Sequence, residues 1–348
     1  MVNRHLILVF FLLMAVITYA VGQGEFSQHT IQSIIQLKSD NNVFLIGLEW
    51  NEKFHGGVKI SYDYGKTWET IPDFENKAVI KIIEDSQSRI WICTEIDGLY
   101  MSHDTGKSWI KLNTKTPVND IEFHEQSIWI SHGYNLNMQK WFKDQGHGVS
   151  KSSDDGKTFF NYSMKYGIPA NNVRDILITN QNKIFISTDV GLAEYIPEKN
   201  KFNSVIIKDN RFKRLLPTYQ GIKDRWGYGK LFQTKQNDII LGFGYQVFSS
   251  SDYGLTWRLI STVKGQVFQF FEHGDYLYIS TSLGVHQIYH DYKLVKLYNI
   301  MNGIKTNSVF TFYIDNKNNY WIGTGSHHKI VSQGLFFSNN QGSSWIEK

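Results

Sequence analysis

A short motif that returns along the chain constrains the fold more than any other feature. It reads Ser-x-Asp-x-Gly-x-Thr/Ser followed by an aromatic residue, and it begins at Ser61, Ser102, Ser152, Ser250 and Ser338, the last copy having Asn in place of Asp. Successive copies are about 40 to 50 residues apart at first and about twice as far apart later. Repeats of this length are typical of folds built by copying one supersecondary unit. The doubled spacings therefore predict two degenerate copies between the recognisable ones.

The two missing copies are located by the strand-like stretches that flank the motif. Residues 184–195 fill the first gap and residues 277–288 fill the second, which makes seven units. Each unit has room for four short strands with alternating apolar side chains and turn residues between them. In the second unit we expect these strands at residues 79–83, 90–94, 98–102 and 108–112. The predicted fold is all-β, a seven-bladed β-propeller of four-stranded antiparallel blades.

The polar residues of the motif have a structural interpretation. An Asp in a tight turn accepts hydrogen bonds from backbone N–H groups, and Gly supplies the positive φ that such a turn requires. The closing aromatic ring is then placed to pack between neighbouring blades. We therefore expect structural roles, and no catalysis, at these motif positions: Asp63, Gly65, Trp68, Asp104, Gly106, Trp109, Asp154, Gly156, Asp252, Gly254 and Trp257.

The repeats resemble two known families. The Ser-x-Asp-x-Gly-x-Thr-Trp copies look like the Asp-box (BNR) repeat of sialidases and related propellers. Residues 166–177 running into 183–192, and residues 301–309 running into 319–324, resemble two-component regulator propeller repeats. Those repeats occur in extracytoplasmic sensor regions of bacterial hybrid histidine kinases. Since the matching residues are turn and packing positions, the resemblance implies the fold and leaves the function open.

The N-terminus has the pattern of an export signal. Residues 6–17 are uninterrupted apolar side chains behind a head that carries Arg4, and the small residues Ala20 and Gly22 precede a possible cleavage point. This order is typical of a secretory signal peptide, and the apolar run is short for a bilayer span. We expect a signal peptide at residues 1–22 and one propeller domain at residues 23–348, secreted or periplasmic, with no membrane span after cleavage. The alternative is an uncleaved membrane anchor.

Composition excludes several partners. The 36 Lys and Arg residues nearly balance the 32 Asp and Glu residues, for a formal net charge of +4, so nucleic acid is not an expected partner. The one cysteine, Cys93, excludes an internal disulfide and any zinc site with two thiolates, and its apolar strand context predicts a buried packing residue. We expect no cofactor and no metal, and we expect a monomer.

Four long connections between predicted strands are the candidate functional regions. They span residues 48–57, 132–147, 208–228 and 325–333, and a propeller places such connections on one face. They hold aromatic, histidine and arginine side chains, which suit a sugar or peptide because rings stack on apolar faces and guanidinium groups hold carboxylates. The candidate ligand-binding residues are Trp50, His55, Trp141, His147, Arg211, Arg225, Trp226, Tyr228 and His327.

These features favour a non-enzymatic module that recognises a polysaccharide, peptide or protein partner through the face with the long connections. A sialidase is disfavoured because the chain has no Arg-Ile-Pro segment. One alternative is another glycan-active enzyme, either a glycoside hydrolase with two carboxylates or a polysaccharide lyase using His147, Tyr228 and Arg225. A second alternative is a periplasmic assembly factor similar to photosystem II stability factor. No catalytic residue is assigned.

Overall fold

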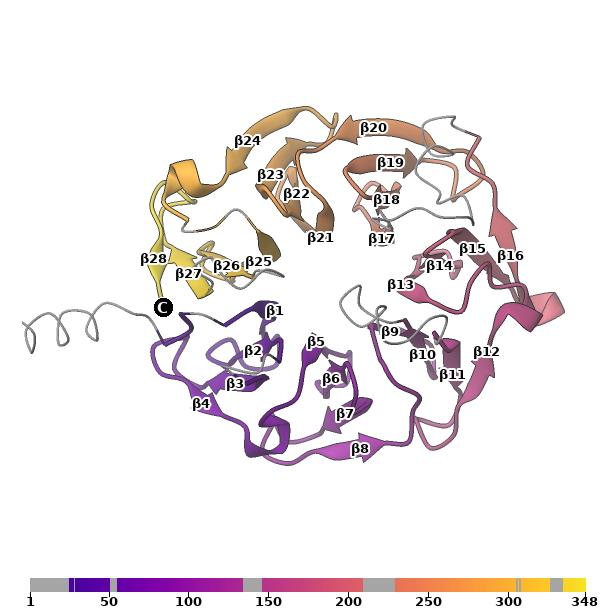
Figure 1. Ribbon diagram of the computed structural model, residues 1–348, viewed down its shortest axis with the longest axis horizontal. Helices are drawn as coiled ribbons and strands as arrows, with labels where there is room; N and C mark the ends of the chain where they lie inside the picture. The colour runs from indigo at the N-terminus through magenta and orange to yellow at the C-terminus, as the bar shows by residue number, and fades with distance from the viewer. Residues whose placement is uncertain are drawn as a thin grey trace, which may run out of the picture.

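The strands form seven four-stranded antiparallel sheets arranged in a ring, which confirms the predicted seven-bladed β-propeller (Figure 1). The computed structural model describes residues 25–27, 29–50, 55–133, 146–208, 229–304, 306, 308–325 and 334–348. The predicted signal peptide at residues 1–22 lies outside the described residues. Within the described ranges, no helix is long and apolar enough to span a bilayer.

Each blade is one continuous stretch of chain, and its strands run outward from the axis in sequence order. Blade 1 contains β1 (Ile31–Gln36), β2 (Phe44–Leu48), β3 (Gly57–Ser61) and β4 (Glu69–Thr70); blade 2 contains β5 (Val79–Glu84), β6 (Ile90–Thr94), β7 (Leu99–Ser102) and β8 (Ile110–Leu112). Blade 3 contains β9 (Asp120–His124), β10 (Ser127–His132), β11 (Gly148–Ser152) and β12 (Phe160–Tyr162); blade 4 contains β13 (Val173–Ile178), β14 (Ile184–Thr188), β15 (Gly191–Ile196) and β16 (Lys201–Val205).

The remaining blades have the same order. Blade 5 contains β17 (Gly229–Gln233), β18 (Ile239–Phe243), β19 (Gln246–Ser250) and β20 (Arg258–Thr262); blade 6 contains β21 (Val267–His273), β22 (Tyr276–Thr281), β23 (Gly284–Tyr289) and β24 (Leu294–Tyr298); blade 7 contains β25 (Val309–Ile314), β26 (Tyr320–Thr324), β27 (Gly334–Ser338) and β28 (Ile346–Glu347). Four short 3₁₀ helices are η1 (Pro72–Phe74), η2 (Met164–Tyr166), η3 (Pro197–Lys199) and η4 (Ile300–Asn302). The units predicted at residues 184–195 and 277–288 are the second and third strands of blades 4 and 6.

The core is divided among the blade interfaces. The second strands read as continuous apolar runs because both faces of each blade pack against a neighbour, and β2, β6, β14, β18 and β26 are buried along their whole length. Among the described residues, one apolar cluster lies between each pair of adjacent blades. Trp91, Trp129 and Trp321 are the largest fully buried side chains and belong to three of these clusters.

The repeated motif forms the turn between the third and fourth strands. In blade 1, Asp63 Oδ1 accepts hydrogen bonds from the Lys66 and Thr67 amides at 3.1 and 2.9 Å, and Ser61 Oγ accepts one from the Gly65 amide at 2.8 Å. Gly65 has a φ of 73°, which favours glycine. The bond from the amide four residues on recurs at Asp104, Asp154, Asp252 and Asn340, and so does the bond from the glycine amide to the first serine of the motif. These side chains therefore satisfy backbone donors, and the adjacent indoles pack inward, Trp68 against Phe26 and Trp109 against Phe74.

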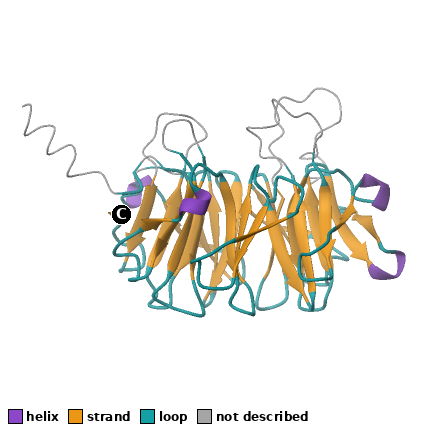
Figure 2. Cartoon of the chain, turned by 90° about the horizontal axis from the view of Figure 1, so that it is seen from below, coloured by secondary structure: helices purple, strands orange, loops and turns teal. Residues whose placement is uncertain are grey.

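The first and last blades close the ring without exchanging a strand. Gln36 Nε2 donates to Asn316 Oδ1 at 3.0 Å, and the Asn316 amide donates to Gln36 Oε1 at 2.9 Å. Next to the C-terminus, the Phe26 amide donates to the Lys348 carbonyl at 3.2 Å. Closure therefore depends on a paired amide contact and on packing of β1 against β25 and β26. Figure 2 shows the resulting disc from the side, with strands spanning its thickness and turns gathered on its two faces.

Candidate ligand pocket on the propeller axis

Most of the predicted ligand-binding residues cannot be placed. Trp141, Arg211, Arg225, Trp226, Tyr228 and His327 lie outside the described residues. Of the other three, Trp50 is 44% exposed, His55 is exposed with a φ of 51°, and His147 is half-buried with its carbonyl accepting from Asn161 Nδ2 at 2.6 Å. None of these three contributes to the described wall of the axial pocket. Their predicted role in ligand binding stays a prediction.

The long connections nevertheless belong to one face. Three of them join a second to a third strand, in blades 1, 3 and 7, and the fourth joins β16 to β17. In a blade whose strands alternate in direction, these two kinds of connection leave from the same end. The turns around Asp63 and its equivalents join third to fourth strands and lie at the opposite end.

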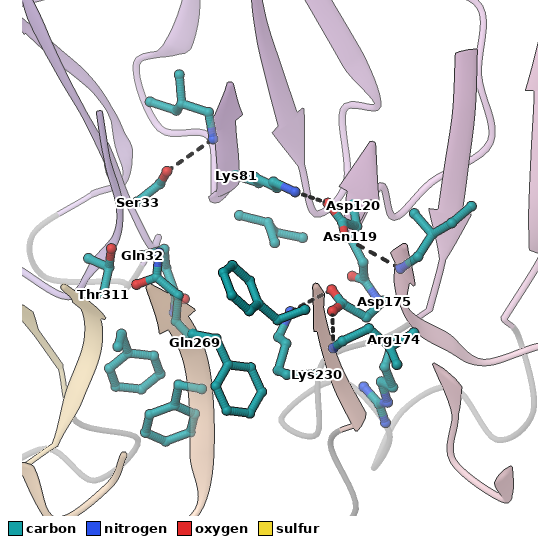
Figure 3. A pocket seen from close by; sticks show the side chains of 18 of the residues that line it. Gln32, Ser33, Lys81, Asn119, Asp120, Arg174, Asp175, Lys230, Gln269 and Thr311 are labelled. Carbon is teal, nitrogen blue, oxygen red and sulfur yellow. Dashed lines mark hydrogen bonds and ion pairs between the residues drawn. The ribbon is translucent and has the colours of Figure 1, made fainter. Parts of the chain in front are cut away.

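A cavity of about 580 Å³ lies on the propeller axis. Its described wall is formed by residues from all seven innermost strands, β1, β5, β9, β13, β17, β21 and β25 (Figure 3). Two further wall residues, Glu49 and Glu95, directly follow β2 and β6. Because second strands end on the face with the long connections, these glutamates place one end of the cavity on that face.

One polar side chain from each blade lines this cavity at an equivalent register position. We call this set the axial ring: Ser33, Lys81, Asp120, Asp175, Lys230, Gln269 and Thr311. Each residue of the axial ring lies opposite a small residue, Gly, Ser or Cys, of the second strand of its own blade. In five blades, the register between the first and second strands shifts immediately before the axial-ring residue. Such bulges re-aim side chains. At the three glycine positions a side chain would collide with the next blade: a Cβ on Gly47 would lie 2.5 Å from Val79 Cγ1.

Four members of the axial ring hold the next blade by a hydrogen bond. Ser33 Oγ accepts from the Ile82 amide at 3.0 Å, and Gln269 Oε1 accepts from the Phe312 amide at 2.8 Å. Asp120 Oδ2 and Asp175 Oδ2 accept from the amides of Ile176 and Leu231 at 3.4 and 2.7 Å. In each case the donor is a backbone amide of the next blade, and it belongs to the residue directly after that blade's axial-ring residue. Part of the ring's polarity is therefore structural.

Two ion pairs cross between blades within the ring. Lys81 contacts Asp120, and Lys230 Nζ lies 3.0 Å from Asp175 Oδ1. Burial disfavours both charges of the first pair, yet the neighbouring carboxylates raise the pKa of Lys81 and the lysine lowers the pKa of Asp120. For Asp175, burial and the adjacent Asp120 outweigh Lys230 and raise its pKa to about 7. Near neutral pH, Asp120 is thus ionised and Asp175 is only partly ionised, which reduces their mutual repulsion.

Three further carboxyl groups line the cavity and form no ion pair with any described residue. Gln32 Nε2 donates to Glu49 at 2.9 Å, and burial raises the pKa of Glu49 despite this bond. Burial and the neighbouring Glu49 raise the pKa of Glu95 to about 7. Burial raises the pKa of Glu122 to about 8; Lys81 opposes this rise, while Asp120 and Asp175 add to it. Within the described ranges, no lysine, arginine or histidine lies within ion-pair distance of these three.

The other arc of the cavity wall is aromatic. The rings of Phe268 and Phe310 are stacked, with centroids 4.5 Å apart and planes 5° apart, and Phe232 and Phe270 lie at 6.2 Å. These residues come from blades 5 to 7. The three glutamates without an ion pair, Glu49, Glu95 and Glu122, come from blades 1 to 3. The cavity therefore has an acidic side and an aromatic side.

Sequence reasoning missed this cavity. In the apolar innermost strands, the isolated polar residues of the axial ring look like ordinary alternation. Superposing the seven units on their second strands would have aligned the ring, since one polar residue then falls at the same place in every unit. Buried Cys93 lies opposite Lys81 in blade 2, and burial raises the pKa of its thiol. Among the described residues, no three His, Cys, Asp or Glu side chains are grouped to hold a metal.

The class of protein is now defined: a seven-bladed β-propeller with a polar axial pocket. Residues 303–326 match the family model described as two component regulator propeller, which confirms that resemblance for this segment. Residues 56–167 match the model described as sortilin, neurotensin receptor 3. No curated protein matches the sequence significantly. The resemblance of the Asp-containing turns to the Asp-box family stays a prediction.

Solved structures show the same fold at low sequence identity. The extracellular domain of the hybrid two component system BT4673 from B. thetaiotaomicron is 16% identical with a TM-score of 0.65; the match covers 89% of this chain and 38% of that one, so this chain spans about two fifths of its length. YCF48 bound to D1 peptide is 11% identical with a TM-score of 0.59, covering 91% and 94% of the two chains. An ancestral GH74 enzyme is 13% identical with a TM-score of 0.63, covering 92% and 46%.

Proposed function

We propose that this chain is an exported, non-enzymatic recognition propeller that binds a polysaccharide, peptide or protein partner on the face with the long connections, and that the axial pocket receives part of that ligand. The observation that carries the proposal is the axial ring, because all seven blades contribute a polar side chain to one concave site. A cavity of about 580 Å³ with apolar and polar walls has the dimensions and composition of a ligand site. The proposed domain is residues 23–348, behind a signal peptide at residues 1–22.

The comparisons support a binding role by analogy. One similar structure is an extracellular domain of a two component system, and another is a propeller bound to a peptide. The chemistry of the ring agrees, since Asp120 and Asp175 already accept backbone amides and contact lysines. Carboxylates held in this way are poorly placed to act as nucleophile or general base.

A glycoside hydrolase is the second candidate. Its supporting observation is that Asp120 and Glu122, two residues apart on β9, have pKa values shifted in opposite directions, as acid and base pairs often have. The similar GH74 enzyme favours the same possibility. Release of new reducing ends from a bound polysaccharide would support this candidate and contradict the non-enzymatic proposal.

The test is a binding screen on glycan and peptide arrays with a variant that fills the pocket. Gln32 is a half-buried wall residue, so Gln32→Trp should occupy the cavity, whereas Gln87→Trp places the same ring on an exposed hairpin. We expect Gln32→Trp to weaken binding of any array ligand at least tenfold and Gln87→Trp to leave it unchanged. Equal binding by both variants would contradict a role for the axial pocket.

A further inference from the structure

The described wall of the axial pocket carries more acid than base. Five carboxyl side chains and three cationic side chains line it. In contrast, the whole chain has a formal net charge of +4. Counted by residue type, the pocket wall is therefore acidic although the whole chain is basic. Because burial raises the pKa of several of these carboxyls, they ionise fully only when a cation lies beside them.

All three cations of the wall are already engaged. Lys81 contacts Asp120, Lys230 contacts Asp175 at 3.0 Å, and Arg174 Nε lies 2.6 Å from Asp189 Oδ1. The acids left over are Glu122, which Lys81 also attracts, and the pair Glu49 and Glu95. Among the described residues, this pair has no lysine, arginine or histidine within ion-pair distance. An anionic ligand would have to displace an internal carboxylate, whereas a cationic ligand would meet carboxyl groups that no basic side chain of the described ranges satisfies.

The acidic and aromatic walls are arranged as two sides of one site. The glutamates without an ion pair belong to blades 1 to 3, and the stacked pair Phe268 and Phe310 belongs to blades 6 and 7, on another arc of the ring (Figure 1). Aromatic faces attract flat apolar groups and cations. A ligand that is flat and apolar at one end and positively charged at the other matches both walls at once.

We infer that the axial pocket takes a small organic ammonium ligand, a protonated amine carried on a flat apolar body. The inference rests on the proposed function and names the kind of chemical group that its axial pocket receives. The ammonium group lies between Glu49 and Glu95, at the end of the cavity near the long connections, and the apolar body lies against Phe268. Because burial and Glu49 raise the pKa of Glu95 to about 7, binding of the cation near neutral pH releases a proton.

The test uses three probes of one shape and different charge: 2-phenylethylamine, 2-phenylethanol and phenylacetate. Titration calorimetry with the full exported chain at pH 7 should detect the amine, with at least tenfold weaker binding of the alcohol and the acid. Repeating the titration in two buffers of different ionisation enthalpy should show proton release. Tighter binding of phenylacetate, or equal binding of amine and alcohol, would overturn the inference.

Variants distinguish binding of the amine in the axial pocket from binding elsewhere on the surface. The Glu95 side chain accepts no hydrogen bond from the described residues, so Glu95→Gln should keep the structure and weaken amine binding about fivefold or more. Glu49→Gln is a second, independent variant, and Glu69→Gln on the exposed outer strand β4 is the matched control. Unchanged amine affinity in both pocket variants, with melting curves showing that both fold, would overturn the inference.

Failure of this inference can be told apart from failure of the proposed function. If the amine does not bind, but a neutral or anionic array ligand binds and Gln32→Trp abolishes its binding, the pocket is a ligand site of another class. If Gln32→Trp affects no ligand, both proposals are wrong. Only amine binding that is lost in Gln32→Trp and weakened in Glu95→Gln supports both.

Discussion

Asp175 of blade 4 joins two consecutive residues of blade 5: its Oδ1 lies 3.0 Å from Lys230 Nζ, and its Oδ2 accepts a hydrogen bond from the Leu231 amide at 2.7 Å. Asp120 makes the corresponding bond from blade 3 to blade 4. The side chains that line the axial pocket therefore also connect the blades, so pocket shape and ring stability are coupled.

Asp175→Ala should destabilise the propeller. The substitution leaves the Leu231 amide and the Lys230 ammonium without their partner, and losing one side of a buried charged contact costs about 2 to 4 kcal/mol. Urea unfolding followed by tryptophan fluorescence measures the change. Asp73→Ala on the exposed surface is the control, with an expected change of at most about 0.5 kcal/mol. Equal stability of the two variants would show that Asp175 does not hold the blades together.

Gln36→Ala should weaken closure of the ring. It removes both hydrogen bonds to Asn316, but Asn316 is exposed and its Oδ1 still accepts from Tyr64 Oη at 3.0 Å, so the cost is about 0.5 to 1.5 kcal/mol. Proteolysis of the native protein should accelerate, with cuts between blades 1 and 7. The exposed Gln87→Ala is the matched control. If Gln36→Ala were as resistant to proteolysis as the control, packing of β1 on β25 would close the ring without the amide pair.

The turn aspartates should make stability fall in acid. Hydrogen bonds from Ser108 lower the pKa of Asp104 to about 2, and those from Thr158 do the same for Asp154. A carboxyl whose pKa is lowered on folding stabilises the fold above its unfolded value near 4, and this contribution disappears as the pH falls towards 2. Thermal melting between pH 5 and pH 2 measures the decline.

Blade 7 supplies a control for that prediction. Asn340 occupies the equivalent turn, where its Oδ1 accepts from the Ser344 amide at 2.9 Å and its side chain does not titrate. Asn340→Asp should steepen the loss of stability in acid, and Asp104→Asn should make it shallower. Parallel curves for the three proteins would show that the turn carboxylates do not govern acid unfolding.

Glu122 should produce the opposite pH dependence. Burial with Asp120 and Asp175 raises its pKa to about 8, while Lys81 opposes the rise. A carboxyl whose pKa is raised on folding stabilises the fold below its unfolded value near 4.5, and that contribution is lost as the pH rises through 8. Glu122→Gln should therefore melt higher than the unmodified protein at pH 8.5, with little difference at pH 4.5. A difference that does not change with pH would contradict the assigned protonation.

The blade architecture could be predicted from the sequence because its signals are local. Asp63, Gly65 and Trp68 lie within one turn, and the same pattern recurs often enough to count the blades. The axial pocket could not be predicted from the sequence, because it depends on the register between strands and on contacts between blades. Whether Lys81 faces the axis depends on a bulge in β5 and on the small Cys93 opposite, and a single strand reveals neither. Its partner Asp120 lies in the next blade, so only the closed ring brings the two together.

The most direct test of the central claim is a crystal structure of the protein with a ligand from the array screen. The account predicts that the ligand lies on the propeller axis, in contact with ring residues such as Lys230 and with the stacked Phe268 and Phe310. A ligand bound on the rim of the disc or on the face with the Asp-containing turns, with the axial cavity free of it, would contradict the account.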